Sequence, residues 1–457
     1  MDLRLAEMGK LKNCPIEYVG NENILEQPVS QVFIDSRQVQ PASLFVAIRG
    51  ERLDGHQFLA EAFEKGALAA LVDQAYFNTQ GKIIVGNFFV VPDTIFALQQ
   101  LANYYRQKFS IPFVAITGTS GKTTTKEMIE AVLSFKYNVL KTSGNLNNHI
   151  GVPLTLFQLN HKHQIALIEM GTNHFGEIKR LTEIAQPDCG LITNIGRGHL
   201  EFFGSLEGVA RAKRELFEGL PPDGTAFINA DDPLLMKNIP PIKRLVFYGI
   251  KNEAQIKGEF LGMLPTGETR FKVFNQEIVL QVPGMHHVYN ALAAISVGLE
   301  FDINVEQIKP LLEQFKPHSK RMEIIRQNEI TILNDCYNAN PDSTMAALST
   351  LKQMSVPGRK IAVLADMLEL GDTAETEHRE IGQQAPQMEL DFLLGYGPLT
   401  RVLVQAAQKS KGIHAIHFDD KIELTDYLVS LLKPGDLVLI KGSRGMAMET
   451  VLEAIIN

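Results

Sequence analysis

The sequence predicts an α/β protein of three domains: an N-terminal mixed α/β domain, a central parallel-sheet domain with a phosphate loop, and a C-terminal doubly wound, Rossmann-like domain. Three observations predict this fold class. A glycine-containing loop at 117–124 joins an apolar strand to a helix, strands and helices alternate after that loop, and a fresh alternation follows a short linker at 317–321. A chain of 457 residues has room for about two to four domains. We place them at residues 1–109, 110–316 and 317–457.

Composition narrows the class of protein. The 44 Lys and Arg and 52 Asp and Glu residues give a net charge of −8, with both signs mixed along the chain, which argues against a general nucleic-acid binder. Three widely spaced cysteines suit a reduced compartment and show no metal-ligand spacing. The first residues lack the apolar core of a signal peptide, and no run approaches the ~20 apolar residues of a membrane span. We expect a soluble cytoplasmic protein that acts as a monomer.

In the first domain, apolar runs predict strands at 29–35, 44–48, 67–72 and 83–91, and helices at 56–65 and 94–109. Two polar segments interrupt them. Asp35-Ser36-Arg37 ends a strand and places a hydroxyl and a guanidinium on a loop, where they suit a phosphate. Asp54-Gly55-His56 lies at a helix start. A turn and a helix N-cap are equally good interpretations, and the sequence alone leaves both open.

The central domain begins with the phosphate loop. Residues 111–116 form an apolar run fit for a buried strand, and apolar residues recur at helical spacing from Met128 to Leu133. Between them stand Thr117, Gly118, Thr119, Ser120, Gly121, Lys122, Thr123 and Thr124. Glycines let backbone N–H groups approach an anion, and a helix N-terminus favours negative charge. Lys122 is predicted to reach the terminal phosphates, and Thr123 or Thr124 to place a hydroxyl on Mg²⁺. A strict phosphate-loop pattern has glycine where Ile116 stands, and an ordinary Gly/Ser turn is the alternative.

Two further strand ends carry polar side chains. The strand at 164–168 leads into Glu169, and the strand at 188–195 leads to His199. A carboxylate at the carboxyl end of a parallel strand beside a phosphate loop is well placed to bind Mg²⁺. His199 is equally well explained as a metal ligand or as a polar loop residue.

The helix predicted at 205–220 contains an unusual lysine. Its apolar residues form one stripe, and Lys213 falls within that stripe, whereas Arg211 and Arg214 do not. A lysine on a buried face is costly to charge, so its pKa should fall. A neutral amine can react with CO₂ to give a carbamate, an anion able to bind Mg²⁺. On the pattern alone, a lysine that reaches water or pairs with a carboxylate is the favoured interpretation.

Later in the central domain, residues 269–282 alternate around Asn275-Gln276 and predict a hairpin. Residues 283–290 then open an alanine-rich helix whose first turn can hydrogen-bond the edge of a base.

The last domain shows a new alternation, with strands predicted at 330–334, 360–364, 392–394, 414–417 and 437–440. Polar groups follow three of these strands, at 335–341, 366–371 and 441–445. Because ligands bind at strand carboxyl ends in open α/β sheets, these groups predict a binding cleft that faces the central domain. Helix capping is the alternative for each group alone.

These residues together resemble the Mur ligases of peptidoglycan synthesis over nearly the whole chain. The family's phosphate loop, Thr-Gly-Thr-x-Gly-Lys-Thr, stands at 117–123. Its strand-end glutamate, loop histidine and helix lysine, which is carbamylated in several members, resemble Glu169, His199 and Lys213. Its adenine-side segment is similar to 284–290, although this chain has His287 where the family usually has asparagine. Its third-domain arginine and aspartate resemble Arg321 and Asp335.

The resemblance implies ATP-dependent ligation through an acyl phosphate, with a substrate-binding first domain for the UDP-sugar, an ATPase central domain that binds ATP, and a C-terminal ligase domain. Lys122, Glu169, His199 and Lys213 are implied to be catalytic. Thr123 or Thr124 is implied to hold one Mg²⁺ with Glu169, and His199 a second with carbamylated Lys213. Beside the loop, the implied ATP contacts are Asn290, Arg321 and Asp335. The last domain is expected to close over the central one, because an acyl phosphate must be shielded from water.

Within the family, four features are similar to the member that adds D-alanyl-D-alanine to UDP-N-acetylmuramoyl-tripeptide. They are 35–37 with 44–48, then 144–153, 335–341 and 366–371. We expect the substrate-binding residues to be Ser36, Arg37, Asn147, Asn148, Asn338, Asn340, Lys441, Ser443 and Arg444. The alternative is the related ligase that adds the third amino acid, which often carries Asp-Asn-Pro-Arg, a tetrapeptide absent here. A GTPase is disfavoured because no Asn-Lys-x-Asp occurs.

Overall fold

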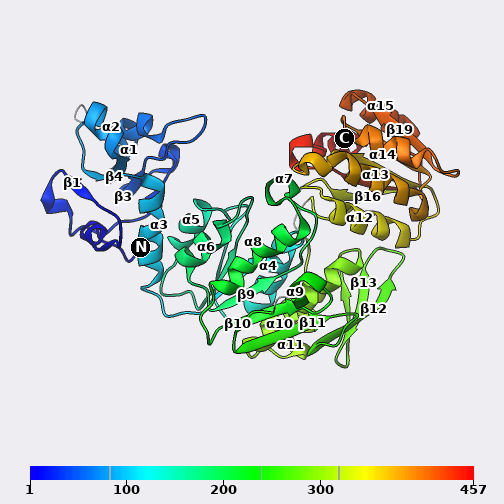
Figure 1. Ribbon diagram of the computed structural model, residues 1–457, viewed down its shortest axis with the longest axis horizontal. Coiled ribbons are helices and arrows are strands. Elements are labelled where there is room, and N and C mark those ends of the chain that lie inside the picture. Colours follow the sequence, from blue (N-terminus) through cyan, green and yellow to red (C-terminus); the bar gives the residue numbers. More distant parts are fainter. Residues whose placement is uncertain (82–83, 238, 318–319, 457) are drawn as a thin grey trace.

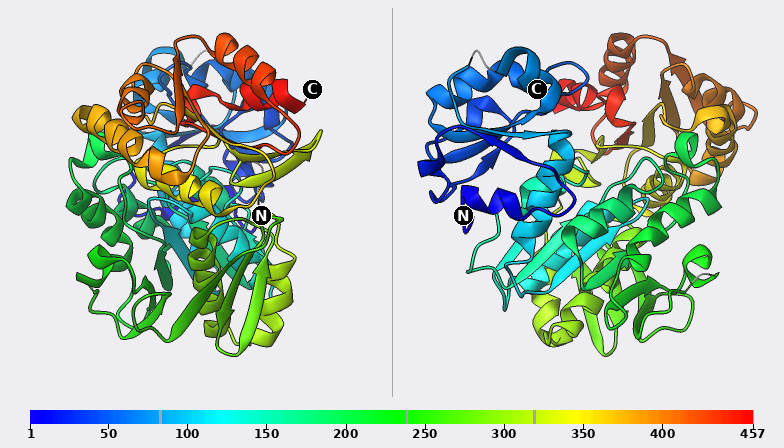
Figure 2. Two further views of the ribbon diagram at one scale, coloured as in Figure 1. Left: turned by 90° about the vertical axis from the view of Figure 1, so that its right-hand side faces the viewer. Right: turned by 60° about the vertical axis from the view of Figure 1, so that its left-hand side comes forward.

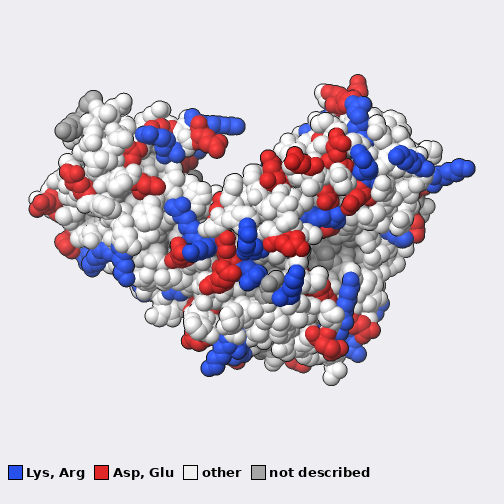
Figure 3. All heavy atoms as spheres, viewed as in Figure 1, with Lys and Arg blue, Asp and Glu red and all other residues white. Residues whose placement is uncertain are grey.

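The computed structural model describes residues 1–81, 84–237, 239–317 and 320–456. It has three α/β bodies, each built on its own sheet, and the first and last of them stand on the central one (Figure 1). The same arrangement is visible after rotation (Figure 2), and the molecular surface is hollowed between the two outer bodies (Figure 3). In the described residues, no helix combines the length and apolar character needed to cross a membrane.

The first sheet has the order β1-β5-β4-β3-β2 and is parallel except for β1. Its strands are β1 (Glu17–Val19), β2 (Val32–Phe33), β3 (Ser43–Val46), β4 (Ala67–Asp73) and β5 (Phe88–Val91). Its helical segments are η1 (Leu5–Lys10), η2 (Glu22–Ile24), η3 (Ser36–Gln38), η4 (Gly55–Phe58), α1 (Leu59–Glu64), α2 (Gln74–Tyr76), η5 (Phe77–Gly81) and α3 (Thr94–Arg106).

Three predicted elements of this domain differ from the structure. The strand predicted at 29–35 is reduced to β2, because Asp35 accepts a hydrogen bond from Arg37 N at 3.0 Å and starts the turn η3. The helix predicted at 56–65 begins as the 3₁₀ turn η4, which Asp54 caps. The strand predicted at 83–91 starts only at Phe88, and residue 83 lies outside the described residues.

Helix α3 joins the first domain to the second. Asp93 caps it by accepting from Ile95 N and Phe96 N. Further along, Asn103 and Arg106 donate to the backbone carbonyls of Ile184 and Ala185 in the central domain. One continuous apolar core therefore runs from the first sheet across α3 to the central sheet.

The central sheet has the order β14-β13-β12-β11-β10-β9-β6-β8-β7, parallel from β7 to β12 and antiparallel beyond. Its strands are β6 (Phe113–Thr117), β7 (Val139–Lys141), β8 (Ile165–Glu169), β9 (Cys189–Ile192), β10 (Thr225–Asn229), β11 (Arg244–Gly249), β12 (Ile256–Met263), β13 (Thr269–Val273) and β14 (Gln276–Leu280). Its helices are α4 (Lys122–Leu133), α5 (Gly151–Leu156), α6 (Glu177–Ala185), α7 (Leu200–Phe203), α8 (Leu206–Glu218), α9 (Pro233–Lys237), α10 (Met285–Glu300) and α11 (Val305–Glu313).

Strand β6 lies between β8 and β9 in this sheet. The carboxyl ends of the three strands therefore bring the phosphate loop, Glu169 and the loop that leads to His199 to one edge. The predicted hairpin is present as β13 and β14, with its turn at Phe274-Asn275, one residue earlier than expected.

The last sheet has the order β15-β16-β20-β17-β18-β19 and is parallel except for β15, an edge strand that the sequence analysis missed. Its strands are β15 (Glu323–Gln327), β16 (Ile330–Asp335), β17 (Lys360–Ala365), β18 (Phe392–Tyr396), β19 (His414–Phe418) and β20 (Leu437–Lys441). Its helical segments are α12 (Pro341–Gln353), η6 (Gly371–Thr373), α13 (Ala374–Gln384), η7 (Ala385–Met388), α14 (Thr400–Ala407), α15 (Lys421–Leu431), η8 (Arg444–Met446) and α16 (Glu449–Ile456). Apolar cores cover both faces, as a doubly wound domain requires. In the predicted linker 317–321, residues 318–319 lie outside the described part.

Candidate active site

The phosphate loop turns directly from β6 into the N-terminus of α4. Two glycines are required for this path. A Cβ atom on Gly118 would lie 1.9 Å from Thr193 Oγ1, and one on Gly121, where φ is +79°, would lie 2.7 Å from Asn290 Oδ1. In the described chain no side chain caps the first turn of α4, and that turn contains no acidic residue. Its backbone N–H groups and the positive end of the helix therefore suit an anion.

Lys122 folds back over the loop. Its Nζ donates to the carbonyl oxygens of Gly118 at 2.8 Å and Thr119 at 3.2 Å. Burial lowers the pKa of Lys122, nearby Glu169 opposes that shift, and Arg321 reinforces it. A bound polyphosphate would favour the charged amine at this position.

Glu169 lies at the end of β8 with a side chain that is 2% exposed. Its Oε1 accepts from Asn147 Nδ2 at 2.8 Å and from Thr123 Oγ1 at 3.3 Å. Thr123 also accepts from Arg321 Nη2 at 3.1 Å. Of the two candidate threonines, Thr123 is thus the one whose hydroxyl contacts the carboxylate, whereas Thr124 is buried in the first turn of α4.

The start of α10 borders the other side of the loop. Asn290 Oδ1 accepts from Thr125 Oγ1 at 3.1 Å, and its Nδ2 lies 3.4 Å from His287 Nδ1. Burial lowers the pKa of His286 to about 4, and burial followed by the neighbouring His286 lowers the pKa of His287 well below its ordinary value. Both rings are therefore neutral at physiological pH.

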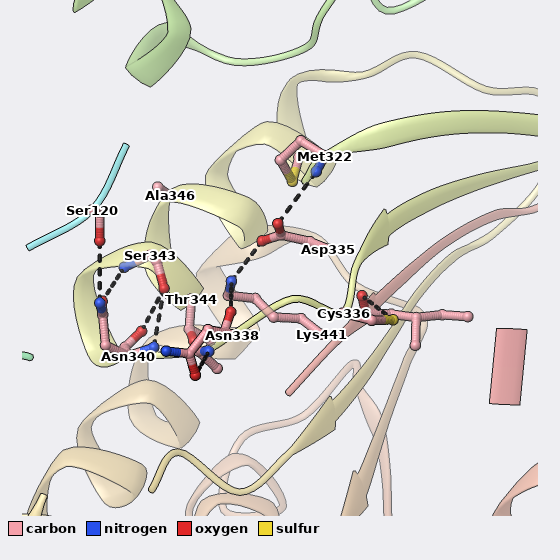
Figure 4. A network of polar contacts seen from close by, with 12 residues as sticks. Ser120, Met322, Asp335, Cys336, Asn338, Asn340, Ser343, Thr344, Ala346 and Lys441 are labelled. Carbon is pink, nitrogen blue, oxygen red and sulfur yellow. Dashed lines mark hydrogen bonds and ion pairs between the residues drawn. The ribbon is translucent and has the colours of Figure 1, made fainter. Parts of the chain in front are cut away.

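The C-terminal domain contacts this loop directly (Figure 4). Asn340 Nδ2 donates to Ser120 Oγ at 3.1 Å while Asn340 Oδ1 caps α12. Behind it, Lys441 Nζ bonds Asp335 Oδ2 at 2.5 Å and Asn338 O at 2.9 Å. The carboxyl ends of β16 and β20 thus meet the phosphate loop across the domain boundary.

A second group of contacts holds the two domains together beside the loop. Arg197, on the segment after β9, pairs with Asp342, Glu377 and Glu380 of the last domain. His199, with a φ of +54°, places Nδ1 2.7 Å from Glu369 Oε2. Apolar residues of α7 and α8 pack into the core of the last domain.

Lys213 lies within α8 and is 2% exposed, as the apolar stripe predicts. No hydrogen bond or ion pair of its amine is present among the described residues. Burial, and secondarily the charge of Lys122, lowers its pKa well below the ordinary value. The amine therefore loses its proton more readily than that of an ordinary lysine.

A cavity of about 730 Å³ lies between the central and last domains. The predicted residues that line it are Thr119, Ser120, Gly121, Lys122, Thr123, Thr124, Asn147, Glu169, Asn290, Arg321, Asp335, Asn338, Asn340 and Lys441. The predicted residues outside its lining are Ser36, Arg37, Gly118, Asn148, His199, Lys213, Ser443 and Arg444.

Several residues outside the lining have local partners. Asn148 Oδ1 accepts from Gly151 N at 2.8 Å at the start of α5. Ser443 Oγ accepts from Leu368 N at 2.8 Å and so joins the loops after β20 and β17. Arg444 pairs with Glu449 at 2.6 Å.

The two polar segments of the first domain have turn-capping contacts. Asp35 caps η3, pairs with Arg37 at 2.7 Å, and has its pKa lowered chiefly by that arginine. Ser36 Oγ bonds Glu61 Oε2 at 2.7 Å. His56 is buried and accepts from Asp73 N at 3.1 Å. The Arg37 side chain is 83% exposed, so it is accessible to a ligand despite its pairing.

Comparison with known proteins identifies the family. Three family models match the chain: "Mur ligase family, catalytic domain" at 28–106, "Mur ligase middle domain" at 116–298, and "Mur ligase, glutamate ligase domain" at 320–444. The UDP-N-acetylmuramoyl-tripeptide--D-alanyl-D-alanine ligase of Bacillus subtilis is 37% identical over 443 residues, 96% of each chain. The chain belongs to the Mur ligase family.

Solved structures of Mur ligases agree with this assignment. MurF from Acinetobacter baumannii matches with a TM-score of 0.88 at 30% identity, covering 99% of this chain and 98% of that one. MurF from Thermotoga maritima, in complex with ADP, matches with a TM-score of 0.83 at 29% identity, covering 93% and 96%. The chain is therefore an enzyme of the ligase class with the three-domain Mur ligase architecture, as the sequence predicts.

The Mur ligase site also contains residues that the sequence analysis did not select. Asn194 accepts from Ser120 N at 3.0 Å and supports the phosphate loop. Asp231 accepts from Tyr289 Oη at 2.8 Å at the α10 side of the cavity. Arg197 forms the contacts between domains described above. Asn194 lies near the end of the strand predicted at 188–195 and Arg197 follows that strand, a signal that could have found them, whereas Asp231 follows β10, which was not predicted.

Proposed function

We propose that the protein joins D-alanyl-D-alanine to UDP-N-acetylmuramoyl-tripeptide with conversion of ATP to ADP and phosphate. The relatives at 37–38% identity from Bacillus subtilis and Haemophilus influenzae carry the name of this ligase, which favours it over the ligase that adds the third amino acid. The proposal is supported mainly by the contacts that the last domain makes with the phosphate loop of the central domain. Arg321 and Asn340 reach Thr123 and Ser120, so residues suited to the nucleotide and to the acceptor line one cavity.

In the proposed reaction, the tripeptide carboxylate attacks the γ-phosphorus of ATP, and ADP leaves. The dipeptide amine then attacks the carbonyl carbon of the acyl phosphate, loses a proton, and expels phosphate as the amide forms. Lys122 and the N–H groups of the loop stabilise charge on the transferring phosphoryl group. The last domain excludes water from the reactive intermediate, consistent with its contacts to the loop.

The residues beside Glu169 fit a Mg²⁺ ion. A buried carboxylate that faces a threonine hydroxyl offers the hard oxygen ligands that Mg²⁺ prefers. We assign Glu169 and Thr123 to this ion, since Thr123 and not Thr124 contacts the carboxylate. When bound with ATP, the ion neutralises phosphate charge.

We propose that His199 and Lys213 are ligands of a second Mg²⁺. The buried amine of Lys213 supports carbamylation, because only a neutral amine adds to CO₂. His199 Nδ1 faces Glu369, so we assign Nε2 as the nitrogen that would face the metal.

For the nucleotide-sugar substrate, Ser36 and Arg37 are proposed to hold the diphosphate, with support from the exposure of Arg37. Asn147 lines the cavity, and Asn148 is proposed beside it for the peptide. On the acceptor side, Asn338, Asn340 and Lys441 line the same cavity, and Ser443 and Arg444 are proposed beside them. We further propose domain boundaries after residues 109 and 316, a cytoplasmic location and a monomeric state.

A substrate panel tests the function. With ATP and UDP-N-acetylmuramoyl-tripeptide, phosphate release should require D-alanyl-D-alanine and remain low with D-alanine, L-lysine, meso-diaminopimelate or glutamate. A site built around both ends of a dipeptide leaves buried donors unpaired when the ligand is too short. Efficient turnover of UDP-N-acetylmuramoyl-dipeptide with a free diamino acid would move the assignment to the third-residue ligase.

A further inference from the structure

A second lysine of α4 lies behind the proposed metal site. Lys126 follows Lys122 by one helical turn and is completely buried, with 0% of its side chain exposed. A buried ammonium group is costly unless charged and polar partners surround it. The proposed mechanism gives Lys126 no role, so its burial beside the phosphate loop needs an explanation.

The amine of Lys126 has three partners on two sides. Its Nζ donates to Thr142 O at 2.7 Å, and it lies 3.3 Å from Glu127 Oε1 and 3.5 Å from Glu169 Oε2. Glu127 is in turn paired with Lys141 near the surface. Alternating charges therefore run from Lys141 inward to the carboxylate that we assign to Mg²⁺.

The two carboxylate oxygens of Glu169 have different surroundings. Oε1 faces the cavity and accepts from Asn147 and Thr123. Oε2 is buried, receives no hydrogen bond among the described residues, and faces the Lys126 ammonium. Thr142 fixes both groups, because its Oγ1 accepts from Glu169 N at 3.0 Å and its carbonyl accepts from Lys126. The carboxylate is thus held with one oxygen toward the loop.

The charges around Glu169 affect whether a divalent cation can bind there. Lys122, Lys126 and Arg321 lie close to Glu169, and Glu127 is the second carboxylate beside Lys126, so basic groups outnumber carboxylates around the nucleotide-free site. A free divalent cation is repelled by such a site, whereas a cation complexed with a triphosphate brings compensating negative charge. We propose that Lys126 is a positioning residue that restricts Glu169 to one metal-facing oxygen and makes divalent-cation binding depend on bound nucleotide. This inference rests on the proposed role of Glu169.

The test measures Mn²⁺ affinity by calorimetry on the full-length protein at pH 8, without nucleotide and with a non-hydrolysable ATP analogue. Wild type should bind Mn²⁺ tightly only with the analogue. Lys126→Met should bind Mn²⁺ without nucleotide at least about tenfold more tightly than wild type, because a repelling charge is removed and Oε2 is released. Lys126→Gln, which keeps a donor for Thr142 O, supplies the same measurement if the Met variant does not fold.

Lys141→Met is the matched control, since it removes a lysine from the same charge network without touching Glu169, and its Mn²⁺ affinity should equal that of wild type. Unchanged nucleotide-free affinity in both Lys126 variants would overturn the inference. Glu169→Gln tests the proposed metal role of Glu169 separately from the positioning role of Lys126. If it binds Mn²⁺ with the analogue as tightly as wild type does, the proposed metal role of Glu169 fails, and the inference fails with it.

Discussion

Arg197 and Asp342 join the central and last domains at the edge of the cavity. The backbone N–H of Arg197 donates to Asp342 Oδ2 at 2.6 Å, and its Nε donates to Oδ1 at 3.0 Å. The same guanidinium reaches Glu377 at 2.8 Å and Glu380 at 3.1 Å. One cation thus offsets part of the repulsion among three carboxylates on α12 and α13. Arg197 is therefore a natural point at which domain closure can be weakened.

Arg197→Ala should shift the protein toward an open arrangement. Partly exposed charge pairs contribute about 1 kcal/mol or less each, so losing this network should lower kcat/KM by roughly tenfold. Small-angle X-ray scattering should show a larger radius of gyration without ligands. Arg401→Ala is the control, because Arg401 pairs with Asp419 inside the last domain. Equal radius and equal kcat/KM in the Arg197 variant would contradict this role.

Lys122→Ala should abolish ATP turnover with little effect on folding. The amine donates to two carbonyls of the loop, and loss of one electrostatic contact to a transition state costs about 10²-fold or more in rate. Phosphate release measures the rate, and circular dichroism checks the fold. Turnover within a few-fold of wild type would place the phosphate site elsewhere.

Lys213→Ala should be nearly inactive and should regain part of its activity with acetate, a small carboxylate that can stand in for the carbamate. Because burial lowers the pKa of Lys213, its amine is neutral, and so able to add to CO₂, over a wider pH range than an ordinary lysine, and this neutral form is lost as the pH falls through the lowered value. Wild-type activity should therefore decline in CO₂-depleted buffer. A fully active enzyme whose native mass in the Mg²⁺-bound state shows an unmodified lysine would contradict carbamylation.

The sequence predicted the local parts of this site and missed its long-range parts. The phosphate loop and Glu169 were predictable because an apolar strand marks each one, and strand ends converge in a parallel sheet. The burial of Lys213 was predictable from helical spacing alone. The burial of Lys126 was not, because the residues from Thr123 to Glu127 are all polar and give no apolar pattern that would indicate burial. That turn is buried only because the end of β7 and the start of α10 lie against it.

The edges of the sheets were the other weak point. Strands β1 and β15 are short, partly exposed and antiparallel, so they lack the continuous apolar run of a buried parallel strand. Contacts between domains, such as Arg197 with Asp342, depend on how two separately folded units meet. No local pattern encodes that geometry.

Arg37→Ala should raise the KM for the nucleotide-sugar peptide and leave the KM for ATP unchanged, because the residue lies in the first domain and outside the cavity lined by the phosphate loop. Stability should change little, since the Arg37 side chain is largely exposed and surface ion pairs contribute little. Steady-state kinetics with each substrate varied in turn measures both constants. Equal shifts in the two KM values would show that the segment is structural.

Two variants of Asn338 can show whether this residue binds the acceptor or only supports its loop. Its Oδ1 accepts from Ala339 N at 2.9 Å, while Lys441 is already engaged by Asp335 and by Asn338 O. The Asn338 Nδ2 group is therefore the donor that we assign to the carboxylate of D-alanyl-D-alanine. Asn338→Asp keeps the acceptor for Ala339 N but places a negative charge beside that carboxylate. It should raise the acceptor KM more than Asn338→Ala does, by about tenfold or more over wild type, with the ATP KM unchanged. An Asp variant that matches wild type, with only the Ala variant impaired, would assign Asn338 to loop structure alone.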